Sequence, residues 1–458
     1  MAEQKKFDVI VVGARCAGAA LSALLAKRGT RVLLLEAAQR GTDMPMSTHF
    51  VHPPGIDVLD ALGVGNHVRA AAPPSRSLAL DLDAVRVRTT YPDGRAGYCI
   101  RRNFLDGWLQ DAAQSAGATF RDRHRVVDLV KQGERVSGVV VRTPHGTETI
   151  GADWVVGADG MHSTIAKLTG AEEYLAREGS RGGYWAYYPA PERWEEDWDG
   201  IIAHEGETLR YVFRCDGDLV LMVAAEPRAV TDRWGKEYRT RLHESLLRGK
   251  VTAPLARGKE PVGKVIGLLR TRFFYRRPVG AGFALVGDAG HFKDFVTGQG
   301  ITDALLDAER LAPALLDGSE LAMERYWRQR DVATLPLHFD ALGQGEVGFN
   351  SAFMRFVMER MAKDPALAGR AALVADRKLS PFDMLPMKGL APWMLSALLR
   401  GRFDVLKGFF HTGRGQGEGQ RELQRRQAML DALDQKTARP AALRPIAEVT
   451  ALPQAIGS

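Results

Sequence analysis

Near the start of the chain, the pattern of hydrophobic and polar residues changes from that of a strand to that of a helix, and then back to that of a strand. Residues 7–12 form a run that is apolar except for Asp8, leucines recur at helical spacing over residues 21–25, and residues 31–35 are largely apolar again. Buried parallel strands are continuous apolar runs, and amphipathic helices repeat their apolar positions every three or four residues. This pattern predicts one βαβ unit over residues 7–36, with its helix ending at Gly29.

The turn of this unit has the composition of a dinucleotide site. Gly13 permits a tight turn, Gly18 lets helix and strand pack closely, and the helix N-terminus presents N–H groups to phosphate oxygens. Arg15 replaces the middle glycine of the usual GxGxxG fingerprint, so either the backbone approaches the phosphates less closely or the guanidinium itself faces them. An acid at the end of the second strand hydrogen-bonds ribose hydroxyls. The predicted dinucleotide contacts are Gly13, Arg15, Cys16, Ala17, Gly18 and Glu36.

Strand patterns dominate the middle of the chain. Residues 77–98 alternate apolar and polar positions up to a Pro-Asp-Gly turn, which is typical of an antiparallel hairpin. Asn103 then has the place of an N-cap for a helix that ends near Gly117. Short strands and turns over residues 118–150 predict a β-meander inserted into the Rossmann-like unit. The aromatic-rich residues 171–277 predict a separate antiparallel sheet.

The end of the chain has mainly helical patterns. Residues 282–316 combine an apolar strand, a long turn and an amphipathic helix, so the chain returns to its first unit. Residues 320–435 follow, with predicted loops at residues 376–392 and at the glycine-rich residues 413–420. The alanine- and proline-rich residues from Lys436 onward predict an extended or disordered tail. The predicted fold class is therefore α/β, with a second sheet and a helical C-terminal region.

Composition narrows the class of protein. The 458 residues, 45% of them hydrophobic, suit a soluble globular chain of two or three packed units. An apolar strand that begins at residue 7 leaves no room for a secretory signal, so we expect a cytoplasmic protein. Three cysteines without paired spacing indicate neither disulfides nor a metal site. The net charge of +7 suits anionic cofactors and substrates. We expect no nucleic-acid partner, and contact with a membrane is not the favoured interpretation.

Three glycine-rich turns, at residues 13–18, 157–160 and 287–300, each follow an apolar strand. In this order and spacing they resemble the turns of the class A flavoprotein monooxygenases, which share the fold of para-hydroxybenzoate hydroxylase. The resemblance covers about residues 5–345. The phrases GARCAG and GDAGHFKD resemble the branch that also holds polyketide hydroxylases and enzymes similar to geranylgeranyl reductase. The resemblance implies a tightly bound, non-covalent FAD.

This resemblance assigns roles to residues outside the first turn. Asp159 matches the family's DG motif, which lies near the flavin pyrophosphate and the nicotinamide cofactor. Gly287 and Asp288 match its GD motif, whose carboxylate accepts hydrogen bonds from the hydroxyls of the ribityl chain. Arg102 matches an arginine that the family places on the flavin side.

A helix N-terminus is also expected beside the flavin. It is opened by Gly298, Gln299 and Gly300, and its N–H groups would face the pyrimidine edge, where the reduced flavin is an anion. Most relatives have a proline before this turn, and this chain has Phe295 in its place. The replacement of this proline by Phe295 affects how the hydroperoxide on the flavin would be positioned, and it does not affect whether FAD binds.

Two histidines occupy a loop that, by the resemblance, runs beside the flavin. Many relatives have an arginine there, whereas this chain has His49 and His52. A histidine with an ordinary pKa near 6.5 takes and returns a proton close to neutral pH, so both are candidates for proton transfer. The other interpretation is that they only hold the loop.

The expected reaction follows from the resemblance. No second glycine fingerprint follows a strand, so NADPH or NADH would bind transiently and reduce the flavin, which would form a hydroperoxyflavin with O2. The substrate would be a large aromatic or polyketide-like compound, hydroxylated or epoxidised between the flavin and the aromatic sheet. Its predicted contacts are Trp185, Tyr187, Tyr211, Phe213 and Phe295.

Three alternatives to this reaction stay open. A flavin-dependent reductase of polyprenyl chains on a membrane surface would use the apolar helices around residues 392–410. A flavin-dependent halogenase would use the GGYWAYYP segment at residues 182–189, although no lysine stands in a matching context near the first motif. A third alternative is a protein that binds FAD without turnover. The chain is expected to be a monomer or a homodimer.

Because the chain leaves its first unit and returns to it, no predicted domain is contiguous. The predicted parts are the FAD-binding domain (residues 1–76, 99–170 and 278–345), the substrate-domain hairpin (77–98), the substrate-binding sheet domain (171–277), the helical C-terminal region (346–435) and the tail (436–458).

Overall fold

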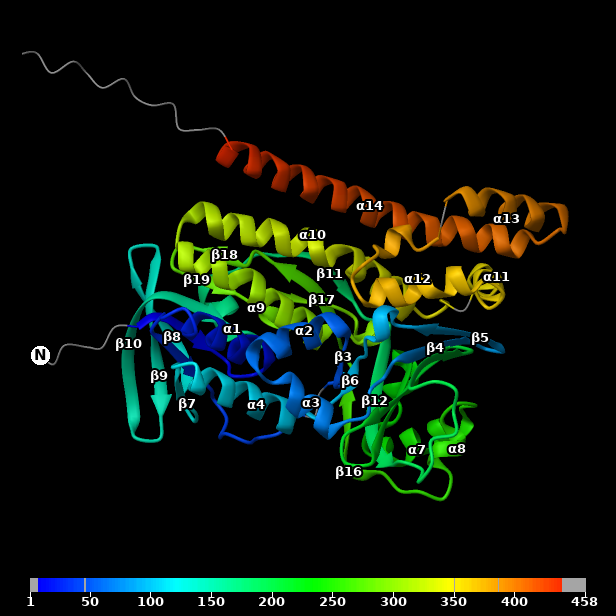
Figure 1. Ribbon diagram of the computed structural model, residues 1–458, viewed down its shortest axis with the longest axis horizontal. Helices are drawn as coiled ribbons and strands as arrows, with labels where there is room; N and C mark the ends of the chain where they lie inside the picture. The colour runs from blue at the N-terminus through cyan, green and yellow to red at the C-terminus, as the bar shows by residue number, and fades with distance from the viewer. Residues whose placement is uncertain (1–6, 45–46, 350, 386, 439–458) are drawn as a thin grey trace, which may run out of the picture.

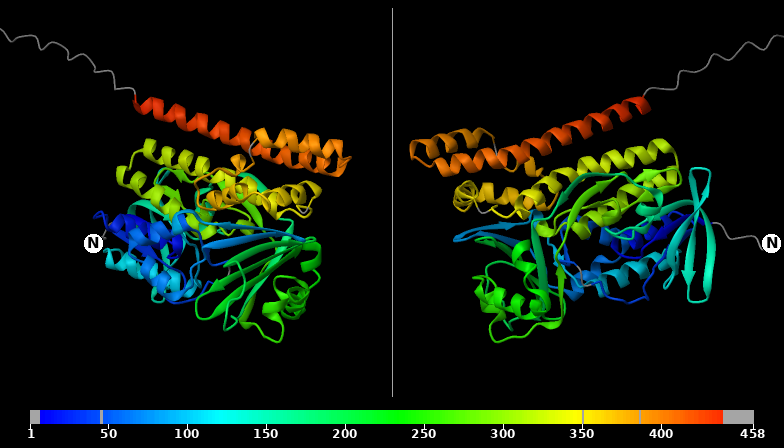
Figure 2. Two further views of the ribbon diagram at one scale, coloured as in Figure 1. Left: turned by 45° about the vertical axis from the view of Figure 1, so that its right-hand side comes forward. Right: turned by 180° about the vertical axis from the view of Figure 1, so that it is seen from behind.

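Two large sheets occupy opposite ends of the molecule, and a layer of long helices lies along one side of both (Figures 1 and 2). The computed structural model describes residues 7–44, 47–349, 351–385 and 387–438. The mixed α/β architecture predicted from the sequence is confirmed.

The first sheet contains the predicted βαβ unit. Its strands are β1 (Phe7–Val12), β2 (Val32–Leu35), β7 (Thr119–Arg121), β8 (Arg125–Gln132), β9 (Arg135–Thr143), β10 (Gly146–Gly157), β18 (Val279–Gly280) and β19 (Phe283–Leu285). Strands β19, β10, β1, β2 and β7 are neighbours in that order and run parallel. The long strand β10 pairs with β9 in its first half and with β1 in its second, which attaches the predicted β-meander to the parallel sheet.

The second sheet collects strands from distant parts of the chain. Its strands are β3 (Phe50–Val51), β4 (Ser77–Leu82), β5 (Val85–Thr90), β6 (Tyr98–Cys99), β12 (Arg181–Pro189), β13 (Gly200–Glu205), β14 (Thr208–Cys215), β15 (Leu219–Pro227) and β16 (Val262–Leu268). The hairpin β4–β5 joins this sheet, as predicted. The sheet is not purely antiparallel, however, because β4 runs parallel to β13 and β6 parallel to β14. These strands enter from another chain segment, so no hairpin turn sets their direction.

Not every strand of the aromatic-rich region belongs to the second sheet. Strands β11 (Glu173–Glu178) and β17 (Arg272–Arg276) pair with each other, and β17 also pairs with β20 (His291–Phe292). Because β20 lies in the long turn of the first unit, this small third sheet connects the two large ones.

Helices cover both large sheets. They are α1 (Cys16–Ala26), α2 (Pro53–Leu62), α3 (Gly65–Ala71), α4 (Arg102–Ser115), α5 (Thr164–Thr169), α6 (Arg228–Thr231), α7 (Tyr238–Arg248), α8 (Ala253–Ala256), α9 (Gly300–Asp317), α10 (Glu320–Gly345), α11 (Ala352–Met361), α12 (Pro365–Ala375), α13 (Met387–Leu399) and α14 (Phe403–Ala438). Helix α1 packs between α4 and α9, and α14 lies along α10. None of the helices in the described ranges is long and apolar enough to cross a membrane.

Two of the predicted loops are helical. The glycine-rich residues 413–420 lie inside α14, and the end of the predicted loop 376–392 belongs to α13. Packing overrides the low helix propensity of glycine at Gly419, where a Cβ would lie 2.7 Å from the rings of Phe339 and Phe382. The bare backbone therefore lets α14 approach α10 closely.

Two helix ends also differ from the sequence prediction. Asn103 is not an N-cap, because α4 already begins at Arg102 and its cap residue, Arg101, has no side-chain capping bond. At the other end of the chain, helix α14 continues to Ala438, three residues into the predicted tail. The rest of that tail, residues 439–458, lies outside the described residues.

Alternation along β12, β14 and β15 gives the second sheet two different faces. On one face Tyr184, Ala186 and Tyr188 pack against α7 and α8. On the other, Trp185 and Tyr211 lie in a cluster that also contains residues of α10 and α12. A strand turns successive side chains to opposite faces, so the aromatic residues with odd numbers are directed toward the first unit and its helices.

Candidate functional site

The turn between β1 and α1 has no room for a side chain at either of the positions occupied by Gly13 and Gly18. Gly13 has a φ of +103°, and a Cβ there would collide with the backbone oxygen of Ala158. A Cβ on Gly18 would collide with the carbonyl oxygen of Gly13. Both glycines are therefore required for this backbone, which lies open to a ligand at the start of the helix.

Free N–H groups point out of the start of α1. The first bond of the helix runs from the N–H of Ala19 to the carbonyl of Arg15. The preceding N–H groups have no acceptor within the helix, and together with the helix dipole they attract an anion. They belong to Cys16, Ala17 and Gly18.

A buried carboxylate that the sequence prediction missed organises the mouth of this turn. Asp106 accepts hydrogen bonds from Arg15 (Nη1, 3.2 Å), from Arg102 (Nη2, 2.9 Å) and from the Cys16 thiol (3.3 Å). Burial raises the pKa of the Cys16 thiol, so this group stays neutral. The two arginines are thus fixed beside the helix N-terminus. The spacing of Arg102 and Asp106, four residues apart on α4, was the available signal.

Glu36 supports the turn from the end of β2. Its carboxylate accepts the N–H of Ala14 at 2.9 Å with one oxygen and the N–H of Ala38 at 2.9 Å with the other. Gln110 donates to the carbonyl oxygen of Ala14 at 2.9 Å. Each carboxylate oxygen has a second lone pair, so Glu36 can still accept a hydroxyl group.

Asp288 is the acid of the site that lacks a protein partner. Gly287 lets the turn approach α1, since a Cβ there would lie 3.0 Å from the Cβ of Ala17. Within the described ranges no group donates a hydrogen bond to the Asp288 carboxylate. Burial raises its pKa to about 6, and the opposing charges of His291 and Arg102 only partly offset this. A ligand with hydroxyl groups would satisfy this carboxylate.

A cluster of buried charges holds the start of α9. Arg377, which follows α12, donates to Gln299 at 2.9 Å and to Asp303 at 2.5 Å. Lys293 also pairs with Asp303, and the two cations hold the pKa of that carboxyl far below its usual range. The sequence prediction placed Gln299, Gly298 and Gly300 here but missed the charged residues, which come from three separate segments.

Asp159 lies at the start of α5 and caps it. Its carboxylate accepts the hydroxyl of Ser163 at 2.5 Å and the N–H groups of Thr164 at 2.7 Å and Ile165 at 3.2 Å. These contacts give Asp159 a structural role. Its predicted role toward the cofactor stays a prediction.

His49 connects the loop of the first unit to the second sheet. Its Nε2 lies 2.5 Å from the hydroxyl of Tyr187 on β12, whereas its buried Nδ1 has no partner in the described part of the chain. Burial, with the nearby charges of Arg102 and Arg101, lowers the pKa of His49 to about 3. The imidazole is therefore neutral at physiological pH and has one free nitrogen.

His52 has both ring nitrogens occupied. Nδ1 lies 2.8 Å from the hydroxyl of Tyr91, and Nε2 lies 3.1 Å from the carbonyl oxygen of Thr297. A carbonyl only accepts, so Nε2 carries the proton and Nδ1 accepts the tyrosine hydroxyl. Burial lowers the pKa of His52 to about 4. These contacts favour the interpretation that His52 holds the loop.

The five predicted substrate residues come together in one aromatic wall on the face of the second sheet. The wall consists of Trp185, Tyr187, Tyr211, Phe213 and Phe295. The ring of Tyr211 lies 6.3 Å from that of Phe213 and 6.4 Å from that of Phe295. Phe50, which the sequence prediction missed, stacks on Phe213 at 4.6 Å. The hydroxyl of Tyr211 is buried and has no partner among the described residues.

The sequence signature of the family described as FAD binding domain matches residues 6–320, more than half of the chain. The chain belongs to this family. One fold can carry different reactions, so membership of the family does not by itself fix the reaction.

Two similar proteins differ in the reaction that their names state. The 6-methylpretetramide 4-monooxygenase of Streptomyces rimosus is 26% identical over 332 residues, which cover 68% of this chain and 75% of that protein. Digeranylgeranylglycerophospholipid reductase 2 of Methanothermobacter thermautotrophicus is 34% identical over 172 residues, 36% of this chain. The chain spans 43% of the length of that reductase.

A solved structure confirms the fold of the family. The myxobacterial chondrochloren halogenase CndH superposes with a TM-score of 0.68, covering 87% of this chain and 90% of the halogenase at 20% sequence identity. The fold alone therefore accommodates a halogenase, and the reaction has to be argued from the site.

The cradle formed by α1, β2 and the turn after β19 fits FAD. Gly13 and the α1 N-terminus would hold the pyrophosphate, with Arg15 beside it, and Glu36 would hold a ribose. Asp288, whose carboxylate has no hydrogen-bond donor among the described residues, would accept hydrogen bonds from the hydroxyls of the ribityl chain. The N-terminus of α9 would lie toward the flavin ring, and Arg102 on its other side.

Proposed function

We propose that this chain is an FAD-dependent monooxygenase that is reduced by transiently bound NADPH or NADH and uses O2. Its substrate would be a large, flat, mostly apolar aromatic or polyketide-like compound that carries hydroxyl or carbonyl groups. Hydroxylation or epoxidation of such a compound needs a cofactor site, a dry aromatic pocket wall and a few polar groups that orient the substrate. The cradle and the aromatic wall supply these parts.

One observation carries the choice of substrate. The apolar surroundings of the aromatic wall contain two polar atoms without a partner among the described residues, Nδ1 of His49 and the hydroxyl of Tyr211. Leaving a buried polar atom unpaired costs about 1–3 kcal/mol. A phenolic or polyketide-like substrate would pair with these atoms, whereas a polyprenyl chain has no group that does so. The wall therefore favours an oxygenated aromatic substrate over the hydrocarbon of the reductase alternative.

The chain's own residues would orient the substrate and keep water out. In the tautomer whose Nε2 carries the proton, His49 donates to Tyr187 and its bare Nδ1 accepts a hydrogen bond from a substrate hydroxyl. With a pKa lowered to about 3, His49 would remain a neutral acceptor while the hydroxyl gives electron density to the ring. The apolar rings of Trp185 and Phe213, which belong to the same wall, would exclude water from the bound substrate.

FAD, when bound, would supply the transfer of electrons from the nicotinamide to O2. The α9 N-terminus would stabilise negative charge on the reduced ring, and Gln299 is fixed at this N-terminus by Arg377. Arg102, held by Asp106, would contribute a second positive charge on the flavin side.

The test is oxygen consumption by the FAD-loaded protein with NADPH or NADH, measured with and without a panel of polycyclic phenols. We expect one or more phenols to increase oxygen uptake and to yield an oxygenated product, with peroxide formation determined in parallel by catalase addition. If the FAD-loaded protein does not oxidise NADPH or NADH, the result supports the alternative of a protein that binds FAD without turnover. A halogenated product in the presence of halide would instead support the halogenase alternative. Saturation of a double bond in a polyprenyl substrate would support the reductase alternative.

A further inference from the structure

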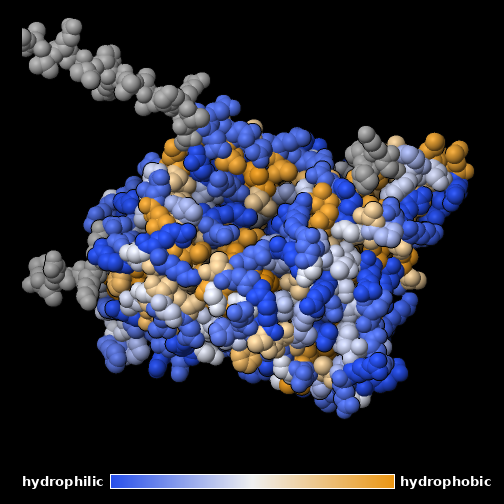
Figure 3. Space-filling model, in the orientation of Figure 1, coloured by the Kyte–Doolittle hydropathy of each residue, from blue (hydrophilic) through white to orange (hydrophobic). Residues whose placement is uncertain are grey.

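Helix α13 has an apolar exposed face. Its outward residues follow helical spacing, with Leu395 55% exposed, Leu398 49% and Leu399 78%. A surface helix ordinarily places polar residues on this face, because its apolar stripe is buried against the core. Figure 3 shows hydrophobic and hydrophilic residues side by side at the upper right, where the α13–α14 end of Figure 1 projects from the body.

The exposed apolar surface continues onto the first turns of α14. Phe403 is 66% exposed and Phe410 65%, and they lie seven residues apart on the same side of the helix. Lys407 and Arg414 follow at the spacing that places them on this side as well. This side of α14 is therefore both aromatic and basic.

Positive charge predominates throughout this α13–α14 tip, which we define as residues 387–421. Asp404 and Glu418 are its only acidic residues, and they already pair with Arg402 and Arg177. The basic residues of the tip whose side chains the structure describes are Arg400, Arg402, Lys407, Arg414 and Arg421. Arg402 is the partner of Asp404, so the other four cations give the tip an unbalanced positive charge.

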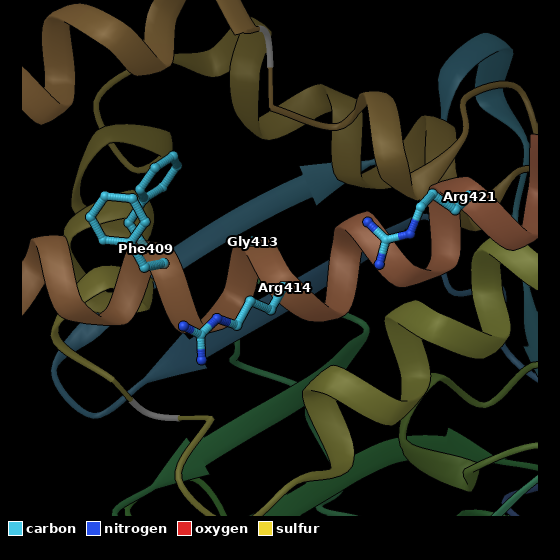
Figure 4. A pocket seen from close by; sticks show the side chains of 5 residues that line it. Phe409, Gly413, Arg414 and Arg421 are labelled. Carbon is cyan, nitrogen blue, oxygen red and sulfur yellow. The ribbon is translucent and has the colours of Figure 1, made fainter.

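A hollow of about 380 Å³ lies on α14 within this tip. It is lined by Phe409, Phe410, Gly413, Arg414 and Arg421 (Figure 4). Neither Arg414 nor Arg421 has an acidic or hydrogen-bonding partner among the described residues. A Cβ on Gly413 would meet nothing within 4 Å, so this glycine is not required by packing, and its bare backbone leaves the hollow open.

We propose that the α13–α14 tip docks on the surface of an anionic phospholipid bilayer. Leu395, Leu399 and Phe403 would enter the boundary between head groups and acyl chains, as the apolar face of an interfacial helix does. Arg414 and Arg421 would bind lipid phosphates at the hollow, because guanidinium groups match phosphate oxygens in geometry and charge. The proposal rests on this surface alone and is independent of the reaction at the flavin site.

The charge of the tip argues for a bilayer rather than a second copy of the chain. A two-fold symmetric contact would bring the same basic surface of both copies together, and like charges at short range repel. An anionic membrane surface instead attracts the cations by about 1 kcal/mol each. Apolar burial and charge then act in the same direction.

The test is co-sedimentation of the FAD-loaded full chain with vesicles of phosphatidylcholine alone or mixed with phosphatidylglycerol. We expect binding to the anionic vesicles, little binding to the neutral ones, and release at high salt. Replacing two cations in Arg414→Gln/Arg421→Gln should weaken partitioning about thirtyfold, from about 1 kcal/mol for each cation. Leu399→Asp/Phe403→Asp should abolish binding.

Matched controls keep the test specific. Leu321→Asp changes an exposed leucine of α10, and Arg142→Gln changes an exposed arginine of β9, both outside the tip. These two variants should bind vesicles as the unaltered chain does, and the FAD absorbance and far-UV circular dichroism of every variant identify any that do not fold. No binding to anionic vesicles overturns the proposal. So does equal loss in the controls, or a concentration-dependent dimer that the tip substitutions dissociate.

Discussion

The cradle and the aromatic wall satisfy their polar groups in opposite ways. In the cradle, Asp106 collects Arg15, Arg102 and the Cys16 thiol, and Glu36 holds two backbone N–H groups. In and beside the wall, two buried polar atoms, Nδ1 of His49 and the hydroxyl of Tyr211, have no partner within the described ranges. The cradle is thus largely complete without a ligand, whereas the wall is not.

Because of this difference, substitutions in the two regions should change different measured quantities. Substitutions in the cradle remove interactions that the folded chain already makes, so they should lower stability or FAD affinity. Substitutions in the wall remove interactions that only a bound substrate would make, so they should lower turnover and leave the fold intact. Asp288 is the exception in the cradle, because its partner would also be a ligand.

The largest effect is expected at Asp106. Asp106→Ala leaves two guanidinium groups side by side without their shared carboxylate, which should lower the free energy of unfolding by about 3–5 kcal/mol. Asp111→Ala is the matched control, because Asp111 lies on the same helix and forms an exposed pair with Arg40. Exposed pairs contribute about 0–1 kcal/mol. Denaturant unfolding of both variants measures this, and equal losses would contradict the role of Asp106.

Asp288→Asn should act on affinity and stability in opposite directions. FAD binding should weaken about tenfold to several-hundredfold, since charge-assisted hydrogen bonds contribute about 1.5–3 kcal/mol each. Fluorescence titration of the apoprotein with FAD measures this loss. Unchanged affinity would remove Asp288 from the cofactor site.

The pH dependence of apoprotein stability provides a second readout for Asp288. Its pKa is raised from an ordinary 3.8 to about 6 in the folded chain, so the folded state binds this proton more tightly than the unfolded state. The stability contribution is present below about pH 4 and is lost as the pH rises through about 6. Asp288→Asn should therefore make the apoprotein more stable at pH 7 and flatten this part of its pH profile, measured by urea unfolding.

The wall is tested by His49 and Tyr211 against His52. His49→Gln and Tyr211→Phe should lower kcat about 5- to 150-fold, the effect of about 1–3 kcal/mol of lost substrate hydrogen bonding. Stability should change little, because neither Nδ1 of His49 nor the hydroxyl of Tyr211 has a partner among the described residues. His52→Gln should instead lower stability by about 1–3 kcal/mol, because both its nitrogens are bonded. Steady-state kinetics and unfolding of the three variants decide this. If His52→Gln lowered kcat more than His49→Gln, the assignment would be reversed.

Among the cradle substitutions, those at Asp159 should change stability least, and they test the border of the cradle. Asp159→Ala removes the acceptor of two N–H groups in the first turn of α5, while the N-cap Ser163 remains, and should cost about 1 kcal/mol. Asp159→Asn keeps an acceptor oxygen for the N–H of Thr164 and should recover most of this loss. If the acid also faces the nicotinamide, both variants will stay yellow and reduce more slowly with NADPH in stopped-flow absorbance. A normal reduction rate in both would leave Asp159 with the capping role alone.

The same contrast explains which parts of the site could be predicted from the sequence. Gly13, Gly18 and Glu36 are predictable because their roles depend on a turn and two strands that are adjacent in the chain. Asp106 was missed because its carboxylate collects donors from two segments, although its spacing from Arg102 was a usable signal.

The wall was predicted as a kind of surface rather than as a set of contacts. Strand alternation identified Trp185 and Tyr211, but Phe50 and Arg377 reach the site through packing between distant segments, which no local pattern encodes. The glycine-rich part of α14 was predicted as a loop for the same reason. Its helix depends on a close approach to α10 that glycine permits and its propensity does not reveal.

The most direct test of the account is the origin of the oxygen atom in the product. The FAD-loaded protein is supplied with ¹⁸O2, NADPH and the phenol that most increases oxygen uptake, and the product is weighed by mass spectrometry. The account predicts that one ¹⁸O atom enters the product, and that His49→Gln lowers the yield while FAD stays bound. A product without the label, or one in which a double bond is reduced instead, would contradict it.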